Sequence, residues 1–461
     1  MRLPLALALA LATALSCARP PAEPPPPSSA LAWRSCGGGF SCADLEVPVD
    51  HAQPAGPKLA LAVARLPADP KSKRIGALVV NPGGPGVSAI DYLRWSWPRL
   101  SPGLRARFDL VAFDTRGTGR STPLDCHTAF GEWMAQDPSP ADDAAWQRAL
   151  AASRALADEC AAKYGALLPH MGSADNARDL DWLRAALGEE QISFLGYSYG
   201  TALGATYLTL YPARVRAVVL DGSIDPSFDL EQFAREQAVA VENALVAYDA
   251  KAQSKGWHGV EALDQAFARA KTKSTVLYAA AEGLSSPPDG WHDLADALGR
   301  EQDGDWSGLD DLATRYFGQR QDGTRELSVE AQLATLCADQ HRMVSAEAYR
   351  EALPRLSAAS PHFGPGNLLS HLPCAFWPAP ASALPEIGGR GGPPVLVLAN
   401  SADPLTPHLW GERLAARFSR ATRVDVDSPA HTAFGRGDPC VDGLVEGYLL
   451  EPAAPPRTHC P

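Results

Sequence analysis

Short apolar runs alternate with longer helical patterns in two stretches of this 461-residue chain. The main apolar runs, each ending in turn-forming residues, occupy positions 76–84, 108–117, 192–198, 215–223, 394–403 and 422–431. Between them, residues 173–188 repeat leucine at helical spacing, and residues 201–212 form a second helical pattern. Strands that alternate with helices predict a mostly parallel central sheet with helices on both faces, which is the α/β class.

The alternation stops between residues 224 and 390. This interval is mostly helical in pattern, as at 229–252 and 329–344, and strand patterns resume after it. An interrupted sheet with an inserted helical cap accounts for this order, and the alternative is an independent helical domain with no role in the site. We therefore expect an α/β core in two parts, residues 33–223 and 391–461, around a cap at residues 224–390.

The first residues have the composition of an export signal. Residues 1–18 begin with an arginine, continue with a short apolar run and end in small residues. The run is too short for a membrane span. Cys17 stands in a sequence that resembles a lipobox, although the leucine lies two residues before the cysteine and not three. Two forms stay open: an envelope lipoprotein anchored through Cys17, and a secreted form cut near Ser16 or Ala18. The proline-rich residues 19–32 predict a stiff tether.

The charge of the chain disfavours a nucleic-acid partner. The formal net charge is −12, and no block of lysine and arginine stands out along the sequence. A nucleic-acid-binding protein needs a basic patch to neutralise phosphates, so this class of function is set aside.

The cysteines predict a disulfide framework. Without Cys17, eight of the nine cysteines remain, and an even number in an exported chain favours disulfides over buried free thiols. No two of them have the C-x-x-C spacing of a zinc site. Near-neighbour pairing in sequence order gives Cys36–Cys42, Cys126–Cys160, Cys337–Cys374 and Cys440–Cys460.

The pentapeptide GYSYG, residues 196–200, stands where a strand pattern gives way to a helix pattern. G-x-S-x-G in that place is typical of a nucleophile elbow, a strained turn that exposes the serine at the edge of the sheet. Gly196 and Gly200 avoid the collisions that side chains would cause there. Ser198 would then lie at a helix N-terminus, whose unpaired N–H groups favour a developing negative charge. The alternative is an ordinary structural turn.

A nucleophilic serine needs a base and an acid, and in this architecture they follow in the order Ser, acid, His. Asp403 comes at the end of the apolar run 394–403, and His431 comes after the next run. Both would lie at the same edge of the sheet as Ser198. Weaker candidates for the acid and the base lie on a strand face or at a helix start: Asp425, Asp427 and His408.

The glycine-rich sequence NPGGPG, residues 81–86, follows the first strand of the parallel set. Its glycines allow the backbone to approach a substrate and to point an N–H group inward. We expect the oxyanion donors to be the N–H groups of Gly84 and Tyr199. Taken alone, the sequence also fits an ordinary glycine–proline turn.

Six segments together resemble one enzyme family: NPGGPG, FDTRGTGRS, DLDWLRAALG, GYSYGT, NSADPLTP and AHTAFG. They are similar to α/β-hydrolase serine peptidases of the proline iminopeptidase and tripeptidyl aminopeptidase type, and most of all to the secreted actinobacterial tripeptidyl aminopeptidases. The similarity extends over roughly residues 33–460 and is weakest in the cap. Asn81 departs from the iminopeptidase pattern, which usually has histidine before the glycine pair.

The resemblance implies an α/β-hydrolase fold and hydrolysis of peptide bonds near a free N-terminus. Ser198 would attack the carbonyl, His431 would take its proton, and Asp403 would orient the imidazole. Gly84 and Tyr199 would hold the oxyanion, and no metal or organic cofactor would be needed. The expected partners are peptide substrates, with membrane attachment only through a lipidated Cys17.

Two rival functions stay open. A carboxylesterase or lipase-like enzyme would use the same triad, because ester and amide hydrolysis both pass through a tetrahedral oxyanion. A non-catalytic surface binding protein on the same scaffold would show a broken triad, whereas this sequence has an intact one. A metal-dependent hydrolase is disfavoured, because the sequence has no H-E-x-x-H motif.

The family resemblance also implies that acidic side chains of the cap recognise the substrate's ammonium group. The first helical pattern of the cap offers Glu231, Glu236 and Glu242. For any single one of these, a solvated helix face is the competing explanation, so the expectation concerns the cap and no individual residue.

Overall fold

A computed structural model describes residues 31–225, 229–318, 328–339, 343, 345–381, 383–389, 391–453, 455 and 457–461. The predicted export signal, Cys17 and most of the predicted tether lie outside these residues. Their assignment stays a prediction.

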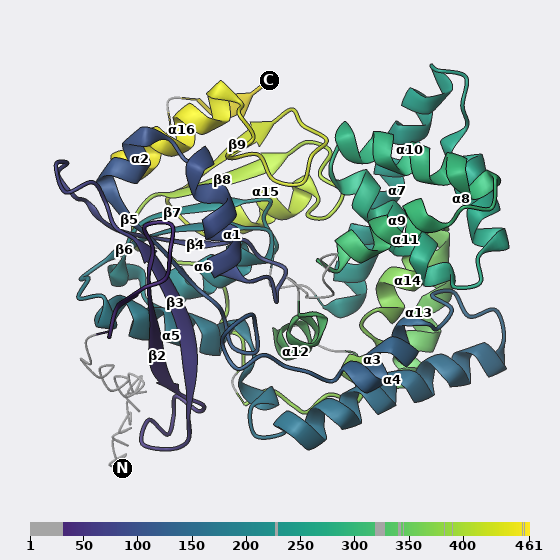
Figure 1. Ribbon diagram of the computed structural model, residues 1–461, viewed down its shortest axis with the longest axis horizontal. Helices are drawn as coiled ribbons and strands as arrows, with labels where there is room; N and C mark the ends of the chain where they lie inside the picture. Colours follow the sequence, from purple (N-terminus) through teal and green to yellow (C-terminus); the bar gives the residue numbers. More distant parts are fainter. Residues whose placement is uncertain are drawn as a thin grey trace, which may run out of the picture.

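One twisted sheet forms the centre of the core (Figure 1). Within the described residues its strands are β1 (Arg34–Ser35), β2 (Ser41–Pro48), β3 (Lys58–Leu66), β4 (Gly76–Asn81), β5 (Phe108–Phe113), β6 (Ile192–Tyr197), β7 (Val215–Asp221), β8 (Val395–Asn400), β9 (Ala421–Val426) and β10 (His459–Cys460). Their spatial order is β1-β2-β3-β5-β4-β6-β7-β8-β9-β10. The pairs β1-β2, β2-β3 and β3-β5 are antiparallel, and all the other pairs are parallel. The predicted mostly parallel sheet is confirmed.

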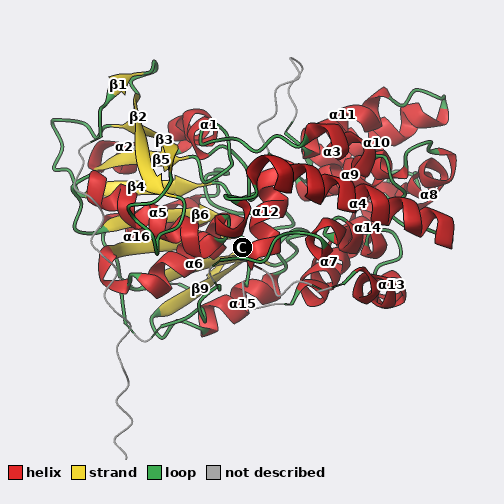
Figure 2. Cartoon of the chain, turned by 90° about the horizontal axis from the view of Figure 1, so that it is seen from below, coloured by secondary structure: helices red, strands yellow, loops and turns green. Residues whose placement is uncertain are grey.

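Helices cover both faces of this sheet (Figure 2). One face packs against α1 (Ala89–Ser96), α2 (Pro102–Arg107) and α16 (Pro439–Leu450). The other face packs against α5 (Ser173–Ala186), α6 (Tyr199–Leu210) and α15 (His408–Ala416). In the described part of the chain, no helix is long and apolar enough to cross a membrane.

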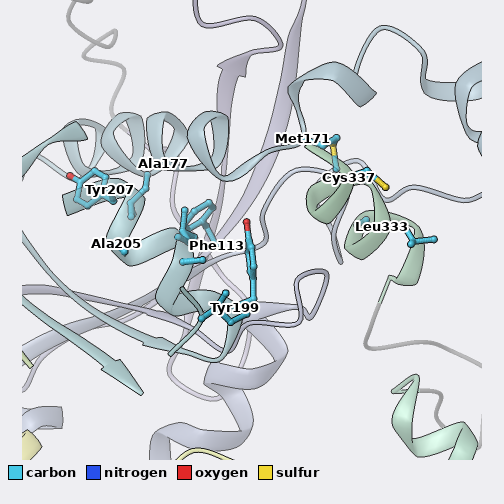
Figure 3. Packing of buried hydrophobic residues seen from close by; sticks show 14 of the residues in the cluster. Phe113, Met171, Ala177, Tyr199, Ala205, Tyr207, Leu333 and Cys337 are labelled. Atoms are coloured by element: carbon cyan, nitrogen blue, oxygen red, sulfur yellow. The ribbon is translucent and has the colours of Figure 1, made fainter. Parts of the chain in front are cut away.

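The central strands are mostly apolar because both faces are buried. Along β4, Val79 joins the cluster under α5 and α6, while Leu78 and Val80 join the cluster under α1 and α16. Figure 3 shows part of the first cluster, in which Phe113 and Tyr199 lie among the core side chains and Leu333 marks its border with the cap. This packing holds the carboxyl ends of the strands in fixed places.

Between β7 and β8 the described chain contains helices and no strand. They are α7 (Leu230–Gln253), α8 (Gly259–Arg269), α9 (Lys273–Ser285), α10 (Asp289–Gln302), α11 (Ser307–Tyr316), α12 (Val329–Asp339), α13 (Ala346–Ala359), α14 (Gly364–Leu369) and the 3₁₀ helix η4 (Leu372–Ala375). The strands on either side of them are direct neighbours in the sheet, with Val218 opposite Val395. The insertion therefore leaves the sheet and returns to it without disturbing the parallel register.

Two helices that precede Ser198 in the sequence pack with this insertion, which the sequence did not indicate. They are α3 (His127–Met134) and α4 (Asp143–Tyr164), which lie beside the cap helices in Figure 1 and in Figure 2. Trp146 and Ala149 of α4 share an apolar cluster with Leu230 and Tyr349 of the cap. The cap is thus built from two separate parts of the sequence.

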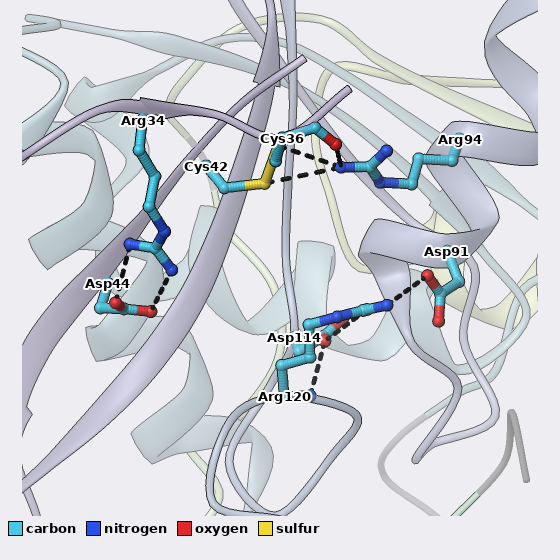
Figure 4. The surroundings of a disulfide bond; sticks show 8 residues. All are labelled: Arg34, Cys36, Cys42, Asp44, Asp91, Arg94, Asp114 and Arg120. Atoms are coloured by element: carbon cyan, nitrogen blue, oxygen red, sulfur yellow. Dashed lines mark hydrogen bonds and ion pairs between the residues drawn. A yellow bond between two sulfur atoms is a disulfide. The ribbon is translucent and has the colours of Figure 1, made fainter. Parts of the chain in front are cut away.

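The predicted disulfide pairing is confirmed at all four bridges: Cys36–Cys42, Cys126–Cys160, Cys337–Cys374 and Cys440–Cys460. Figure 4 shows the first bridge, where the Arg94 guanidinium donates to the carbonyl oxygen of Cys36 at 3.1 Å. The third bridge joins α12 to η4 inside the cap. Each bridge therefore links residues that are at most 37 positions apart in the sequence.

Candidate active site

Ser198 lies in a tight turn between β6 and α6. Its backbone has φ of 52° and ψ of −125°, a left-handed conformation that is strained for a residue with a side chain. A Cβ atom on Gly196 would lie 2.4 Å from the carbonyl oxygen of Gly200, and one on Gly200 would lie 2.6 Å from that of Asn81. Strand, turn and helix thus stand in the predicted order, and both glycines are needed for steric reasons.

His431 and Asp403 lie together in the loops after β9 and β8. The Nδ1 atom of His431 is 3.0 Å from each carboxylate oxygen of Asp403. Thr406 donates through Oγ1 to Asp403 at 2.8 Å, and the backbone N–H of Thr406 donates to the other oxygen at 2.9 Å. The carboxylate is therefore fixed on both sides, which leaves Nε2 of the imidazole as the nitrogen that faces away from the acid.

Asp403 is buried yet ionised readily. Burial opposes its charge, but the charge of His431 and the hydrogen bonds from His431 and Thr406 outweigh that effect, so the pKa of Asp403 lies below its ordinary value. An anion in this position holds the imidazole in one orientation and stabilises its protonated form.

The turn with Ser198 and the loop with His431 meet at the end of β7. The N–H of Ser198 donates to the carbonyl oxygen of Asp221 at 2.9 Å. The next residue, Gly222, has its α-carbon so near the histidine that a Cβ there would lie 3.3 Å from Cε1 of His431. The structure thus brings the three predicted triad residues to the same edge of the sheet.

The glycine loop lies directly against this turn. A Cβ on Gly83 would lie 2.9 Å from the backbone nitrogen of Tyr199 and equally close to Cβ of Ser198. Gly84 lines the same cavity as Ser198. Within the described part of the chain, the N–H groups of Gly84 and Tyr199 have no protein acceptor. Asn81 accepts from the N–H of Gly83 at 3.0 Å, so this departure from the iminopeptidase pattern shapes the loop.

Helix α12 of the cap contacts both the glycine loop and the turn. The N–H of Ser328 donates to the carbonyl oxygen of Gly86 at 2.9 Å. Asp339, at the end of α12, accepts from the N–H of Ser173 at 2.6 Å and from the hydroxyl of Tyr199 at 3.4 Å. Burial raises the pKa of Asp339 to about 6, although the hydrogen bonds from Ser173 and Tyr199 lower it. The cap is therefore hydrogen-bonded to the residue that follows Ser198.

A cavity of about 160 Å³ opens on Ser198 beneath the cap. Most of its lining is apolar or aromatic, including Trp133, Phe233, Tyr278, Leu333 and Phe363. The polar side chains among the described lining residues are neutral or imidazole groups: Ser198, Gln237, Gln332, Asn367, Ser370, His371 and Thr406. This surface suits an uncharged acyl group better than a charged one.

The three glutamates of the first cap helix do not line this cavity. Glu231 binds Arg355 at 2.6 Å, Glu236 binds Arg413 and the indole N–H of Trp410, and Glu242 binds His362 and Ser360. Each carboxylate is thus occupied by a partner in the protein. None of the three is among the described residues that line the cavity at Ser198, and the expectation that acidic side chains of the cap recognise the ammonium group stays a prediction.

The weaker candidates for acid and base pair elsewhere. His408 lies 2.7 Å from Asp425, and Asp427 lies 3.1 Å from His459 on the surface. Neither pair contributes to the lining of the cavity at Ser198.

Sequence reasoning missed Asp221, Thr406 and Gly83. Thr406 lies in the NSADPLTP segment and Gly83 in NPGGPG, so their segments were noticed but not their roles. Asp221 ends an apolar run, and a carboxylate at the end of a buried strand is itself unusual. The position of Asp221 at the end of a buried strand was therefore the signal in the sequence that could have identified it.

Comparisons with known proteins show the family of this chain. The profile described as alpha/beta hydrolase fold matches residues 76–438. The serine protease Hip1 of Mycobacterium tuberculosis is 32% identical over 458 residues, covering 91% of this chain and 86% of that protein. The tripeptidyl aminopeptidase of Streptomyces coelicolor is 32% identical over 455 residues, covering 92% and 84%. Carboxylesterase B of Mycobacterium tuberculosis is 34% identical over 449 residues, covering 90% and 85%. The resemblance found in the sequence is confirmed.

Proposed function

This chain belongs to the alpha/beta hydrolase fold family and is a serine hydrolase, and from this premise we propose that it cleaves peptide bonds near a free N-terminus and releases short peptides. One observation carries the proposal: Ser198, in its strained turn, opens into a capped cavity beside the Asp403–His431 pair. The names of two relatives, a serine protease and a tripeptidyl aminopeptidase, support a peptide substrate.

In the proposed reaction, Ser198 attacks the scissile carbonyl while His431 accepts its proton through Nε2. Asp403 holds Nδ1 and stabilises the imidazolium. The N–H groups of Gly84 and Tyr199 bind the oxyanion of the tetrahedral intermediate. His431 then donates the proton to the leaving amine, and a water molecule, activated by the same imidazole, hydrolyses the acyl-enzyme.

Ester hydrolysis is the second candidate. Carboxylesterase B is as similar to this chain as the two peptidases are, and the apolar cavity also suits an acyl chain. The triad does not discriminate between the two, because both reactions pass through the same kind of oxyanion.

The discriminating experiment compares one peptide reporter with a free and with an acetylated N-terminus near pH 7, beside a series of short p-nitrophenyl esters. We expect acetylation to lower kcat/KM by roughly 10²-fold, because a charged hydrogen bond is lost and its partner is left unpaired. The acceptor that we propose for the ammonium group is the amide oxygen of Asn367 in the cavity, since that of Gln237 already accepts from the Asn367 amide nitrogen at 3.1 Å. Ser198→Ala is the control that must be inactive on every substrate.

Equal rates on the free and acetylated reporters would remove the aminopeptidase proposal. Turnover restricted to the esters would establish the second candidate. Cleavage of acetylated peptides at internal bonds would make the enzyme an endopeptidase.

We further propose that the enzyme works outside the cytoplasm. The four disulfides suit an oxidising compartment, where such bridges persist. The intact mass of the mature protein distinguishes the two forms left open by the sequence, because a lipidated Cys17 adds acyl chains that a secreted form lacks.

A further inference from the structure

Asp221 contacts both halves of the proposed catalytic machinery. It is the last residue of β7 and is fully buried. Its carbonyl oxygen accepts from the N–H of Ser198 at 2.9 Å. Its carboxylate accepts from the N–H of Ala433 at 3.0 Å and from that of Phe434 at 2.7 Å. One residue therefore holds the turn that carries Ser198 and the loop that carries His431.

The histidine loop needs such an anchor. Thr432, directly after His431, has φ of 65°, a left-handed conformation that is costly for a β-branched residue. Such a conformation persists only where neighbouring contacts fix it. Two backbone N–H groups on one buried carboxylate form charge-assisted hydrogen bonds, which are stronger than neutral ones. They follow the strained residue immediately, so they offset its cost and define where the imidazole lies.

We propose that Asp221 is a positioning residue for the reaction, whose ionised carboxylate fixes residues 431–434 and thereby sets the imidazole of His431 against Ser198. The inference rests on the proposed function, because it takes Ser198 and His431 as one reacting unit. Asp403 touches the imidazole itself, whereas Asp221 acts on it through the backbone.

Asp221 also brings a second buried negative charge to the histidine. Burial raises the pKa of Asp221 to about 6; the N–H groups of Phe434 and Ala433 and the charge of His431 lower it, and Asp403 raises it. The titratable and charged groups around this pair are His431, Asp403, Tyr92, Tyr197 and Arg436. The anion stabilises the imidazolium that forms when the serine is deprotonated.

Asp221→Asn is the primary test, because it keeps the size of the side chain and removes its charge. The full-length enzyme is assayed for kcat and KM on a reporter peptide, for the rate at which a fluorophosphonate labels Ser198, and for the pH profile of kcat/KM. We expect kcat to fall by about 10²-fold with KM changed less than about threefold, since a misplaced reacting group acts on the chemical step. Fluorophosphonate labelling of Ser198 should slow in parallel with kcat. The acid limb of the pH profile of kcat/KM should move to lower pH, because the imidazolium loses a neighbouring anion.

Asp109→Asn is the matched control. Asp109 is also a buried strand aspartate that accepts from a backbone N–H, that of Ala68 at 2.9 Å, but it lies at the opposite end of the sheet, where β5 begins. Its variant should keep the wild-type kcat and acid limb. Asp221→Ser, a smaller variant that retains an oxygen acceptor, serves as the second replacement.

Wild-type kcat and an unshifted acid limb in a folded Asp221 variant would overturn the inference. Failure of both Asp221 variants to fold while Asp109→Asn folds would overturn it as well, because the role would then be in folding and not in positioning. Failure of the proposed function is visible separately, since wild-type enzyme would then leave the peptide reporter uncleaved, while fluorophosphonate labelling of Ser198 would still report on the Asp221 variants.

Discussion

The carboxyl edge of the sheet and the first helix of the cap use their acidic residues in opposite ways. At the edge, Asp403 and Asp221 are buried, and both are directed at the segment around His431. In the cap, Glu231 and Glu242 bind basic or imidazole partners away from the cavity. The cap turns an apolar and aromatic surface to the cavity instead.

We therefore expect the edge of the sheet to provide the reacting groups and the cap to provide the shape of the cavity. Charges at the strand ends are held by backbone hydrogen bonds in short loops, so their geometry is fixed to within the tolerance that catalysis needs. Charges on the first cap helix bind neighbouring side chains away from the cavity, and we expect the apolar surface that faces the cavity to discriminate between substrates by size and polarity. Mutations in the two regions should therefore fail in different ways.

The most severe loss is expected at the edge, from Ser198→Ala. The turn tolerates the small side chain, while the nucleophilic oxygen is lost, so kcat should fall by roughly 10³-fold or more in a protein that still folds. His431→Ala should behave alike, and the double variant should be barely worse than either single one. Steady-state kinetics with circular dichroism as the folding control measure this. A folded Ser198→Ala variant with a tenth of the wild-type kcat would exclude Ser198 as the nucleophile.

The second prediction compares a bridge in the cap with one in the core. Cys337–Cys374 closes a loop with a separation of 37 residues, and Cys36–Cys42 one of 6. Replacing both cysteines by serine should lower the free energy of unfolding by about 4 kcal/mol for the first pair and about 2 kcal/mol for the second, because the longer loop frees more chain entropy in the unfolded state. Urea unfolding curves give both values. A larger loss at the small core loop would contradict the ranking.

Gly83→Ala tests how closely the edge is packed. A Cβ there would lie 2.5 Å from the carbonyl oxygen of Tyr197, so the glycine loop or the turn must shift. We expect kcat to fall by about 10²-fold through a displaced oxyanion donor. Gly131→Ala is the control, because a Cβ meets nothing within 4 Å in helix α3 and alanine favours a helix. Similar kinetics for the two variants would show that the approach of the loop is not needed.

The smallest effect is expected in the cap, from Glu231→Gln. This variant removes the ion pair with Arg355, which is largely exposed and outside the cavity. Such pairs contribute little, so kcat/KM on the free-amine reporter should change less than about twofold. The ratio between the free and acetylated reporters should also stay constant. A ratio that collapses in this variant would return the ammonium site to the first cap helix.

That Ser198, Asp403 and His431 lie at one edge of the sheet could be predicted because the motifs that contain them are local. GYSYG contains the serine together with the glycines that its turn requires, and Asp403 and His431 directly follow apolar runs. The α/β fold followed from the alternation of strands and helices, and the disulfide pairing from near-neighbour order. Each of these features depends on residues that are close together in the chain.

The rest depends on residues far apart in sequence. The bonds of Asp221 to Ala433 and Phe434 join residues that are 212 and 213 positions apart in the sequence, and no local pattern encodes such a contact. Helical spacing in the sequence predicted that the three cap glutamates share a helix, but it did not predict the direction in which each side chain points. The packing of α3 and α4 against the cap was missed for the same reason, since their apolar faces fit any helical partner.

Because the disulfides link only cysteines that are close in the sequence, they do not connect the two halves of the protein to each other. The bridges at Cys36, Cys126, Cys337 and Cys440 each close within 37 residues or fewer, so none crosses the helices from α7 to α11. A protease cut anywhere in those helices would therefore yield two fragments with no covalent link, held together by the pairing of β7 with β8 and the packing around it. On a non-reducing denaturing gel the nicked enzyme would migrate as two bands. In the export that we propose, the bridges at Cys36, Cys126 and Cys337 are able to close as soon as their own segments have crossed the membrane, before the last strands of the sheet have arrived.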